Sequence, residues 1–261
     1  MPGPARAAGR LLRAGIHIAA GWWTIRFDFP RLDAAQRRAR VSSWSMGLLR
    51  ILGVELEMHG ALPDDGALLL VSNHISWLDI PAIHAAHHVR FVSKSAVRYW
   101  PVIGALSTGA GSLYIERERQ RDALRVVHRM TEALAAGDRI AVFPEGTTGE
   151  GPVLLPFHAN LLQAAISAGA PVVPMAIHYV HADDGSHSPA PRFVGDDTLV
   201  ASLWRTLRSR PLVAVLRFGL PQTSIGRERR AWAGDLRLVV QALKDAPRAT
   251  RPEHEAGAAA A

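Results

Sequence analysis

The sequence predicts an α/β protein, a single domain whose mixed, mostly buried central sheet is flanked by helices and preceded by an N-terminal amphipathic two-helix segment. Two observations lead to this fold class. From residue 54 onward, short apolar runs alternate with helical stretches, which is typical of a layered α/β fold. Before them, the pattern is helical and strongly basic. We therefore expect a basic helical membrane-docking segment at 1–53, an α/β domain at 54–246 and a disordered tail at 247–261.

The N-terminal segment is predicted to form two helices. Residues 10–29 fit an amphipathic helix that Pro30 ends. A second helix begins after Asp33, which can form a capping box with Gln36, and it ends before Gly53. The polar stripe of the first helix consists of Arg10, Arg13, His17, Thr24 and Asp28.

Positive charge is concentrated in the same segment. The formal net charge of +7 arises entirely within residues 1–50, where nine arginines face two acidic residues, and the other 211 residues sum to zero. Such a segment indicates an anionic partner, either nucleic acid or an anionic membrane surface. The paired Trp22 and Trp23 favour a helix in the membrane interface, and the alternative is a helix packed on the main body. The longest clean apolar run, at 18–25, is too short to span a bilayer.

The remaining pattern places the elements of the α/β domain. Apolar runs indicate strands, and apolar residues at helical spacing indicate helices. A stretch rich in Asp, Gly, Ser and Pro at 181–191 is expected to be a surface loop. We expect strands at 54–58, 67–71, 91–92, 113–115, 139–143, 172–179 and 213–218, and helices at 120–136, 158–168, 199–208 and 229–243.

The most informative segment follows the second expected strand, where His74 and Asp79 lie five positions apart. If a helix starts nearby, the carboxylate of Asp79 can reach the imidazole and orient it, which leaves the other ring nitrogen to accept a proton. The chain has no cysteine and no G-x-S-x-G serine. The attacking hydroxyl would then belong to the substrate, which indicates direct acyl or phosphoryl transfer. The alternative is that His74 is a turn residue and Asp79 a helix cap.

Two further segments could bind an anion. A glycine-rich turn with Gly146 and Thr147 follows the strand expected at 139–143, which suits a phosphate, or is a simple connection. Arg117 lies at the end of a short strand and is a bidentate partner for phosphate, or is a solvated charge. Lys94 is a further anion-binding candidate, and the alternative is a solvated surface lysine.

Taken in order, these segments resemble the signature blocks of the glycerolipid acyltransferases, with the 1-acyl-glycerol-3-phosphate (lysophosphatidate) acyltransferases as the nearest branch. The resemblance covers about residues 45–220, and the basic N-terminus resembles the membrane-docking entry of bacterial members. The blocks read Asn73-His-x-Ser-x-x-Asp79, Gly111-x-x-Tyr-Ile-x-Arg117, Phe143-Pro-Glu-Gly-Thr147 and Val172-Val-Pro-Met-Ala176.

The resemblance implies an activity and a set of site residues. His74 and Asp79 are expected to be the catalytic general-base pair. A fatty acyl group would pass from acyl-CoA or acyl carrier protein, as co-substrate, to the free hydroxyl of a lysolipid, without a metal or other cofactor. The enzyme is expected to be peripheral or monotopic on the cytoplasmic face of a bacterial inner membrane. The acceptor-binding residues that the resemblance implies are Arg117, Glu145, Gly146 and Thr147.

Two departures from the family pattern bear on the acceptor. Tyr114 replaces the usual Phe, which is a mild change, and Thr148 stands where many members carry Arg. The first expectation is 1-acyl-glycerol-3-phosphate, which yields phosphatidate. The lost cation weakens a phosphate-headed acceptor and leaves lyso-ornithine lipid or another lysolipid as the alternative. Functions of a different class are a basic nucleic-acid-binding protein and a membrane lipid-binding module that does not catalyse.

Overall fold

The computed structural model describes residues 3–115 and 120–248. The predicted site residue Arg117 and most of the predicted tail therefore lie outside the described residues. The described residues form one seven-stranded sheet in the order β1-β7-β6-β2-β5-β3-β4. Only the β6–β7 pair is antiparallel among these neighbours, so the sheet is mixed, as predicted.

All seven expected strands are present in this sheet. β6 is the longest and runs two residues beyond its predicted end, and β3 extends its prediction at both ends. The bounds are Val54–His59 (β1), Leu68–Ser72 (β2), Arg90–Lys94 (β3), Leu113–Ile115 (β4), Arg139–Val142 (β5), Val172–His181 (β6) and Leu212–Phe218 (β7).

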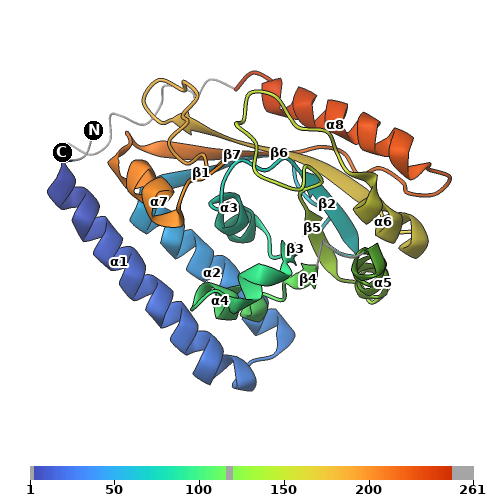
Figure 1. Cartoon of the computed structure of the whole chain (residues 1–261), viewed down its shortest axis with the longest axis horizontal. Helices are drawn as coiled ribbons and strands as arrows, with labels where there is room; N and C mark the ends of the chain where they lie inside the picture. Colours follow the sequence, from blue (N-terminus) through green and yellow to red (C-terminus); the bar gives the residue numbers. More distant parts are fainter. Residues whose placement is uncertain (1–2, 116–119, 249–261) are drawn as a thin grey trace, which may run out of the picture.

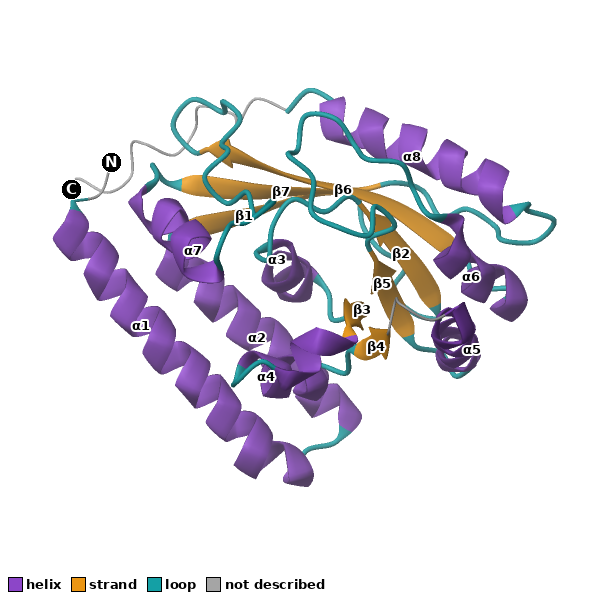
Figure 2. Ribbon diagram, in the orientation of Figure 1, coloured by secondary structure: helices purple, strands orange, loops and turns teal. Residues whose placement is uncertain are grey.

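Helices cover both faces of the sheet (Figures 1 and 2). One face carries α5, α6 and α8, and the other carries α2, α3 and α7, with α1 as an outer layer against α2 and α7. The bounds are Pro4–Trp23 (α1), Ala34–Leu52 (α2), Asp79–Ala86 (α3), Ile103–Gly109 (α4), Gln120–Ala135 (α5), Leu162–Ala168 (α6), Leu199–Arg208 (α7) and Arg229–Asp245 (α8).

The sheet is buried because its strands supply apolar side chains to both layers. In β2, Leu68 and Leu70 belong to the apolar cluster on one face, whereas Leu69 and Val71 belong to the cluster on the other. Alternate residues of a strand point to opposite faces, so an unbroken apolar run is what a strand covered on both sides requires. The strands thus form a rigid support whose ends can position functional side chains.

The second N-terminal helix begins and ends as predicted. The Asp33 carboxylate accepts from the amide of Gln36 at 2.8 Å, and the Gln36 side chain accepts from the amide of Asp33 at 3.0 Å. This capping box satisfies amides that the first turn leaves without helical partners. At the other end, Gly53 adopts a left-handed conformation with φ of 75°.

The first helix differs from its predicted bounds. It starts at Pro4 rather than residue 10, then continues through a π-helical turn, Thr24–Asp28, and a 3₁₀ turn, Phe29–Arg31. Three small residues at seven-residue spacing, Ala7, Ala14 and Gly21, are buried.

Small residues allow α1 to approach α2 closely. A side chain at Gly21 would collide with the indole of Trp44. Trp44 donates to the carbonyl of His17 at 3.0 Å, and His17 Nε2 lies 2.8 Å from the carbonyl of Trp44. The polar His17 therefore faces the protein. The exposed face carries large apolar side chains instead: Leu12, Ile16, Trp22, Trp23 and Phe27. No helix among the described residues is long and apolar enough to cross a membrane.

Candidate active site

The candidate site forms where two neighbouring parallel strands end. β2 ends at Ser72, two residues before His74, and β5 ends at Val142, three residues before Glu145. The two strands are paired in parallel, so their carboxyl ends lie at one edge of the sheet. Ligand sites of open α/β sheets form at this edge. The topology therefore brings the first and third sequence blocks together.

His74 and Asp79 form the predicted pair. The Nδ1 atom of His74 lies 2.7 Å from Oδ2 of Asp79, the first residue of α3. The imidazole also stacks on the ring of Phe143, with the ring centroids 3.9 Å apart. Since Nδ1 is engaged by the carboxylate, Nε2 is the nitrogen that can accept a proton from a substrate. The side chain of His74 is 17% exposed, so the ring is held firmly but reachable.

The carboxylate of Asp79 is buried and surrounded by donors. Its Oδ2 accepts from the amides of Ile75 and Ser76, at 2.7 and 2.9 Å. Its Oδ1 accepts from the hydroxyl of Tyr179 at 2.7 Å. Burial and the charge of Asp79 raise the pKa of Tyr179 well above its usual value, so this hydroxyl remains a donor. These contacts fix the orientation of the carboxylate that holds the His74 ring.

The loop that carries His74 is anchored to β6. The side-chain amide of Asn73 donates to the carbonyl of Ile177 at 2.9 Å and accepts from its amide at 2.8 Å. β2 ends opposite Met175, and β6 continues beyond that point to His181. The extra length of β6 supplies both Ile177 and Tyr179. Sequence analysis did not identify either residue as part of the site.

The buried carboxylate of Glu145 connects the loop after β2 to the loop after β5. Its Oε1 accepts from the amide of His74 at 2.7 Å, and its Oε2 accepts from the amide of Leu155 at 2.8 Å. The residue is only 5% exposed. Burial raises the pKa of Glu145, while the two amides act in the opposite direction. The structure thus gives this carboxylate a positioning role, and its predicted contact with the acceptor stays a prediction.

The other residues of the third block lie on the turn that follows. Gly146 has a φ of 75°, which explains the glycine, and Thr147 is exposed. The amide of Gly149 donates to the carbonyl of His74 at 2.7 Å. Thr148, where many family members carry Arg, donates its hydroxyl to the carbonyl of Phe193. The turn is therefore fixed beside His74, with Thr147 facing solvent.

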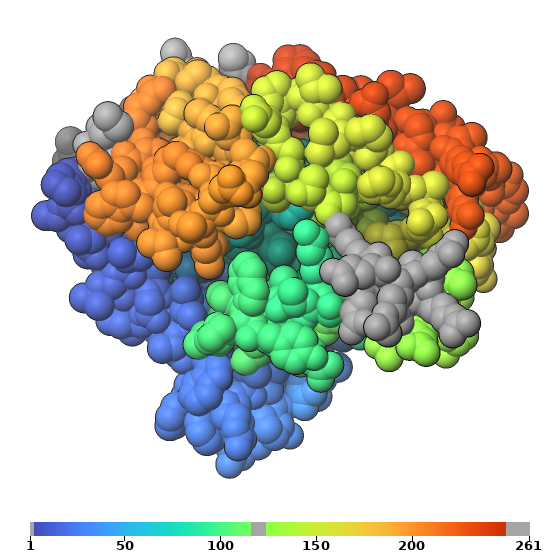
Figure 3. All heavy atoms as spheres, viewed as in Figure 1, coloured from blue at the N-terminus to red at the C-terminus, as the bar shows by residue number. Residues whose placement is uncertain are grey.

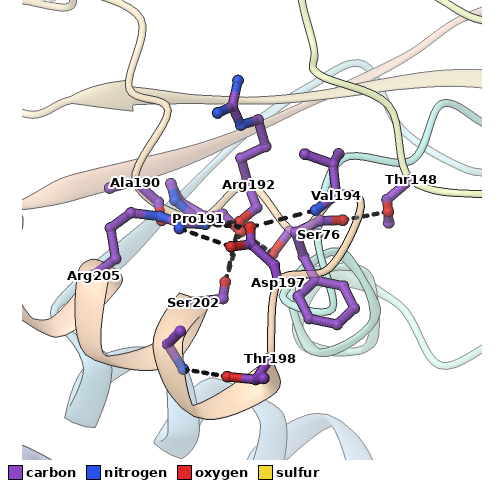
Figure 4. Close-up of polar contacts among 12 residues, drawn as sticks. Ser76, Thr148, Ala190, Pro191, Arg192, Val194, Asp197, Thr198, Ser202 and Arg205 are labelled. Atoms are coloured by element: carbon purple, nitrogen blue, oxygen red, sulfur yellow. Dashed lines mark hydrogen bonds and ion pairs between the residues drawn. The ribbon is translucent and has the colours of Figure 1, made fainter.

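A loop between β6 and α7 covers this turn (Figure 4). Ser76 donates to the carbonyl of Pro191 at 2.5 Å, and the amide of Phe193 donates to the carbonyl of Ile75 at 3.1 Å. From α7, Arg205 bonds to the carbonyls of Ala190 and Arg192 and to the carboxylate of Asp197. The loop is consequently attached to the segment that carries His74 and Asp79.

This loop also supplies an ion pair next to the third block. Arg192 Nη1 lies 3.1 Å from a carboxylate oxygen of Glu150, which follows Gly149 on the turn. The Nε atom of Arg192 is buried and has no hydrogen-bond partner among the described residues. The ion pair therefore places one cation and one anion next to the turn that is hydrogen-bonded to His74.

The space-filling view shows a hollow in this region (Figure 3). Teal atoms from the segment around α3 are visible at its floor, and green, yellow-green and orange segments surround it. These colours correspond to the regions around α4, the loop after β5 and the loop before α7. Lys94, an alternative anion-binding candidate, is exposed at the end of β3. The described residues contain no group of three or more His, Cys, Asp or Glu side chains that could hold a metal ion.

Comparisons with known proteins show the family of this chain. The acyltransferase family model matches residues 54–178. A lyso-ornithine lipid O-acyltransferase of Pseudomonas aeruginosa is 35% identical, and the match covers 88% of both chains. The chain belongs to the acyltransferase family. A 1-acyl-sn-glycerol-3-phosphate acyltransferase of Neisseria gonorrhoeae is 34% identical over 70% of this chain and 71% of the relative.

A solved structure supports the same fold. The crystal structure of the 1-acyl-sn-glycerophosphate acyltransferase PlsC from Thermotoga maritima aligns with a TM-score of 0.61 and 18% identity. The alignment covers 89% of this chain and 95% of that one. This likeness confirms the predicted fold class, whereas the family model and the relatives confirm the family resemblance and the assignment as an acyltransferase.

Proposed function

We propose that this acyltransferase transfers a fatty acyl group from the thioester of acyl-CoA or acyl carrier protein to the free hydroxyl of a lysolipid, without a metal or other cofactor. The paired His74 and Asp79 at the carboxyl end of β2 are the observation that carries the proposal. The relatives named as acyltransferases of lyso-ornithine lipid and of 1-acyl-sn-glycerol-3-phosphate support a lysolipid as acceptor.

In the proposed mechanism, Nε2 of His74 removes the proton from the acceptor hydroxyl as its oxygen attacks the thioester carbonyl. Asp79 stabilises the imidazolium that forms. When the tetrahedral intermediate collapses, the carbon–sulfur bond breaks and the proton passes from His74 to the departing thiolate. The products are the diacylated lipid and a free thiol, and no acyl-enzyme forms. General-base catalysis of this kind contributes about 10²- to 10⁴-fold to a rate.

The test is acyl transfer by purified protein from both donors to a panel of lysolipids. His74→Ala should lower kcat by at least about 10²-fold while the protein stays folded. His128→Ala is the control, because that histidine is exposed on α5. An unchanged rate in folded His74→Ala protein would refute the mechanism. Transfer to none of the lysolipids by the wild-type protein would refute the proposed acceptor class.

A specific observation favours lyso-ornithine lipid over the first expectation, 1-acyl-glycerol-3-phosphate. Thr148 provides no cation for a phosphate, whereas Arg192 and Glu150 offer opposite charges side by side. An ornithine headgroup carries a carboxylate and an ammonium group, which match such a pair by charge. We therefore propose an amino-acid-headed lysolipid as the preferred acceptor.

This preference is tested by comparing kcat/KM for the two acceptors. Arg192→Ala should raise KM for lyso-ornithine lipid about tenfold or more, since a lost charged hydrogen bond costs roughly 1.5–3 kcal/mol. Arg210→Ala is a matched control, because Arg210 is equally exposed and pairs with Asp183 and Asp184 away from this turn. A higher kcat/KM for 1-acyl-glycerol-3-phosphate would reverse the assignment.

We also propose that the protein acts as a peripheral or monotopic protein at an anionic membrane surface, on the cytoplasmic face of a bacterial inner membrane. The exposed apolar face of α1 supports this proposal, since its large side chains face away from the protein. Cations and aromatic side chains on one helix suit an anionic bilayer. Ile16→Asp should release the protein from phosphatidylglycerol-containing vesicles, whereas unaltered sedimentation would show that α1 is not the anchor.

A further inference from the structure

A second apolar feature lies outside the N-terminal helices. The chain between β3 and α4 exposes three large apolar side chains, Tyr99, Trp100 and Val102, which are 80%, 46% and 38% exposed. We call residues 99–102 the aromatic tip. Scattered apolar residues are normal on a protein surface, but a contiguous group of them marks an interaction site.

The backbone of the aromatic tip is ordered in a strained turn. The amide of Ile103 bonds to the carbonyl of Pro101 at 2.6 Å, which closes a γ-turn around Val102. Val102 has a φ of 63° and is the only non-glycine residue with positive φ among the described residues. A β-branched residue in this region costs roughly 1–3 kcal/mol, and such strain clusters at functional positions.

The neighbouring residues keep this turn in place. Gly104 is buried, and a side chain there would collide with the carbonyl of Arg98. The amide of Gly104 donates to the carbonyl of Trp100 at 2.9 Å, and the amide of Leu106 donates to the carbonyl of Val102 at 2.9 Å. These backbone hydrogen bonds hold the turn in a conformation in which its apolar side chains are exposed.

The charged residues nearest the aromatic tip in sequence are cations. The sequence from residue 80 to 115 contains no Asp or Glu, whereas Lys94 and Arg98 flank the tip. Both cations are exposed, and the Arg98 guanidinium lies over the ring of Tyr114. Apolar side chains surrounded by cations are complementary to an anionic bilayer, whose interior accepts the rings while its surface attracts the charges.

The aromatic tip leads into α4, which packs against the N-terminal helices. α4 packs against the π-helical turn that follows α1, where Gly109 contacts Ile25. In Figure 3 the green atoms around α4 adjoin the blue atoms of α1, and the hollow with the teal floor opens beside them. The segment around α4, which includes the tip, therefore lies next to both the N-terminal helices and the hollow.

We propose that the aromatic tip is a second membrane-docking element, which inserts into an anionic lipid surface beside the mouth of the active site. The proposal rests on the proposed function, because a lysolipid acceptor resides in such a surface. Insertion at two places, α1 and the tip, would fix the tilt of the protein and direct the hollow toward the bilayer. Membrane binding and acyl transfer are measured in separate assays, so failure of the docking proposal can be distinguished from failure of the proposed function.

The experiment is sedimentation of the full-length protein with vesicles of phosphatidylglycerol and phosphatidylcholine. Trp100→Ser should weaken partitioning about tenfold, which corresponds to withdrawing about 60 Å² of ring surface from water at roughly 25 cal/mol per Å². Ile225→Ser is the control, since Ile225 is 78% exposed on the loop between β7 and α8, away from α1 and α4 (Figure 1). Transfer to a soluble short-chain lysolipid should be unchanged by either substitution.

A labelling experiment keeps the proposal testable if Trp100→Ser does not fold. The chain has no cysteine, so Tyr99→Cys creates a unique attachment point for an environment-sensitive dye. Its emission should shift to the blue when the vesicles are added, and the same dye on Ile225→Cys should not respond. Equal responses at both positions, no response at Tyr99→Cys, or partitioning that Trp100→Ser does not weaken would overturn the proposal. A shift that requires protein concentration rather than vesicles would assign the tip to self-association instead.

Discussion

Tyr179→Phe tests whether the buried carboxylate next to His74 is oriented by its hydrogen bonds. The substitution removes one oxygen and keeps the ring, which is 1% exposed. Oδ1 of Asp79 then loses the 2.7 Å bond from Tyr179, while Oδ2 keeps its backbone donors. A buried acceptor left without its partner costs about 1–3 kcal/mol, and more if charged. At roughly 2–4 °C per kcal/mol, a loss of about 2 kcal/mol lowers Tm by about 4–8 °C.

The same substitution should lower kcat by about tenfold, much less than the roughly 10⁴-fold loss known for removing the carboxylate charge of a comparable catalytic pair. Asp79 would keep its charge and its contact with His74, but one restraint on its orientation would be gone. Thermal unfolding and initial rates of acyl transfer measure the two effects. Tyr99→Phe is the control, because that ring is 80% exposed. An unchanged Tm together with an unchanged kcat would refute the reasoning.

The other predictions concern the second buried carboxylate and the response to acid. Glu145→Gln should lower the free energy of unfolding by about 1–3 kcal/mol and should also lower kcat. The glutamine side chain has only one accepting oxygen, so it cannot accept from the backbone amides of both His74 and Leu155. Urea unfolding and initial rates of acyl transfer measure the two effects. Burial lowers the pKa of His84 from 6.5 to about 3, so the unfolded state binds more protons between those values. The free energy of unfolding should therefore fall by roughly 1.4 kcal/mol per pH unit below pH 6 from this group, and His84→Leu should reduce that slope in urea titrations. A slope identical to wild type would contradict the second prediction.

The sequence predicted the elements that have a strong local pattern. Apolar runs identified every strand of the sheet, and the capping box and terminal glycine located α2. It also placed His74 and Asp79 together, since they lie five positions apart and a helix begins at Asp79. These features depend on neighbouring residues and can be recognised without the rest of the fold.

Other parts of the site depend on contacts between residues distant in sequence. Tyr179 and Ile177 lie about a hundred residues from their partners, Asp79 and Asn73, and nothing in the local pattern of β6 marks them. The two helices that the sequence analysis did not identify, α3 and α4, are short. α3 is mostly buried and contains Pro81, so it shows neither an amphipathic stripe nor a typical interior composition.

The orientation of α1 could not be derived from its polar stripe. A surface helix of a soluble protein buries its apolar stripe, yet α1 directs His17 toward α2 and exposes Ile16 and Trp23. The buried side has alanine and glycine at seven-residue spacing, which permits close packing without large side chains. The sequence shows both patterns, but only the packing against Trp44 decides which one faces the protein.

The arrangement of the catalytic segment also limits where a substrate anion can bind. Three successive amides, those of His74, Ile75 and Ser76, all donate to the buried carboxylates of Glu145 and Asp79. Successive amides are the usual donors of a backbone anion site, but here the protein's own carboxylates already use them. These three amides are therefore not free for the charge of an acceptor headgroup, and we expect side chains at the mouth of the hollow to meet it. On this reasoning, we expect residues of the loop after β5 and the loop before α7, rather than the segment around His74, to determine which lysolipid is acylated.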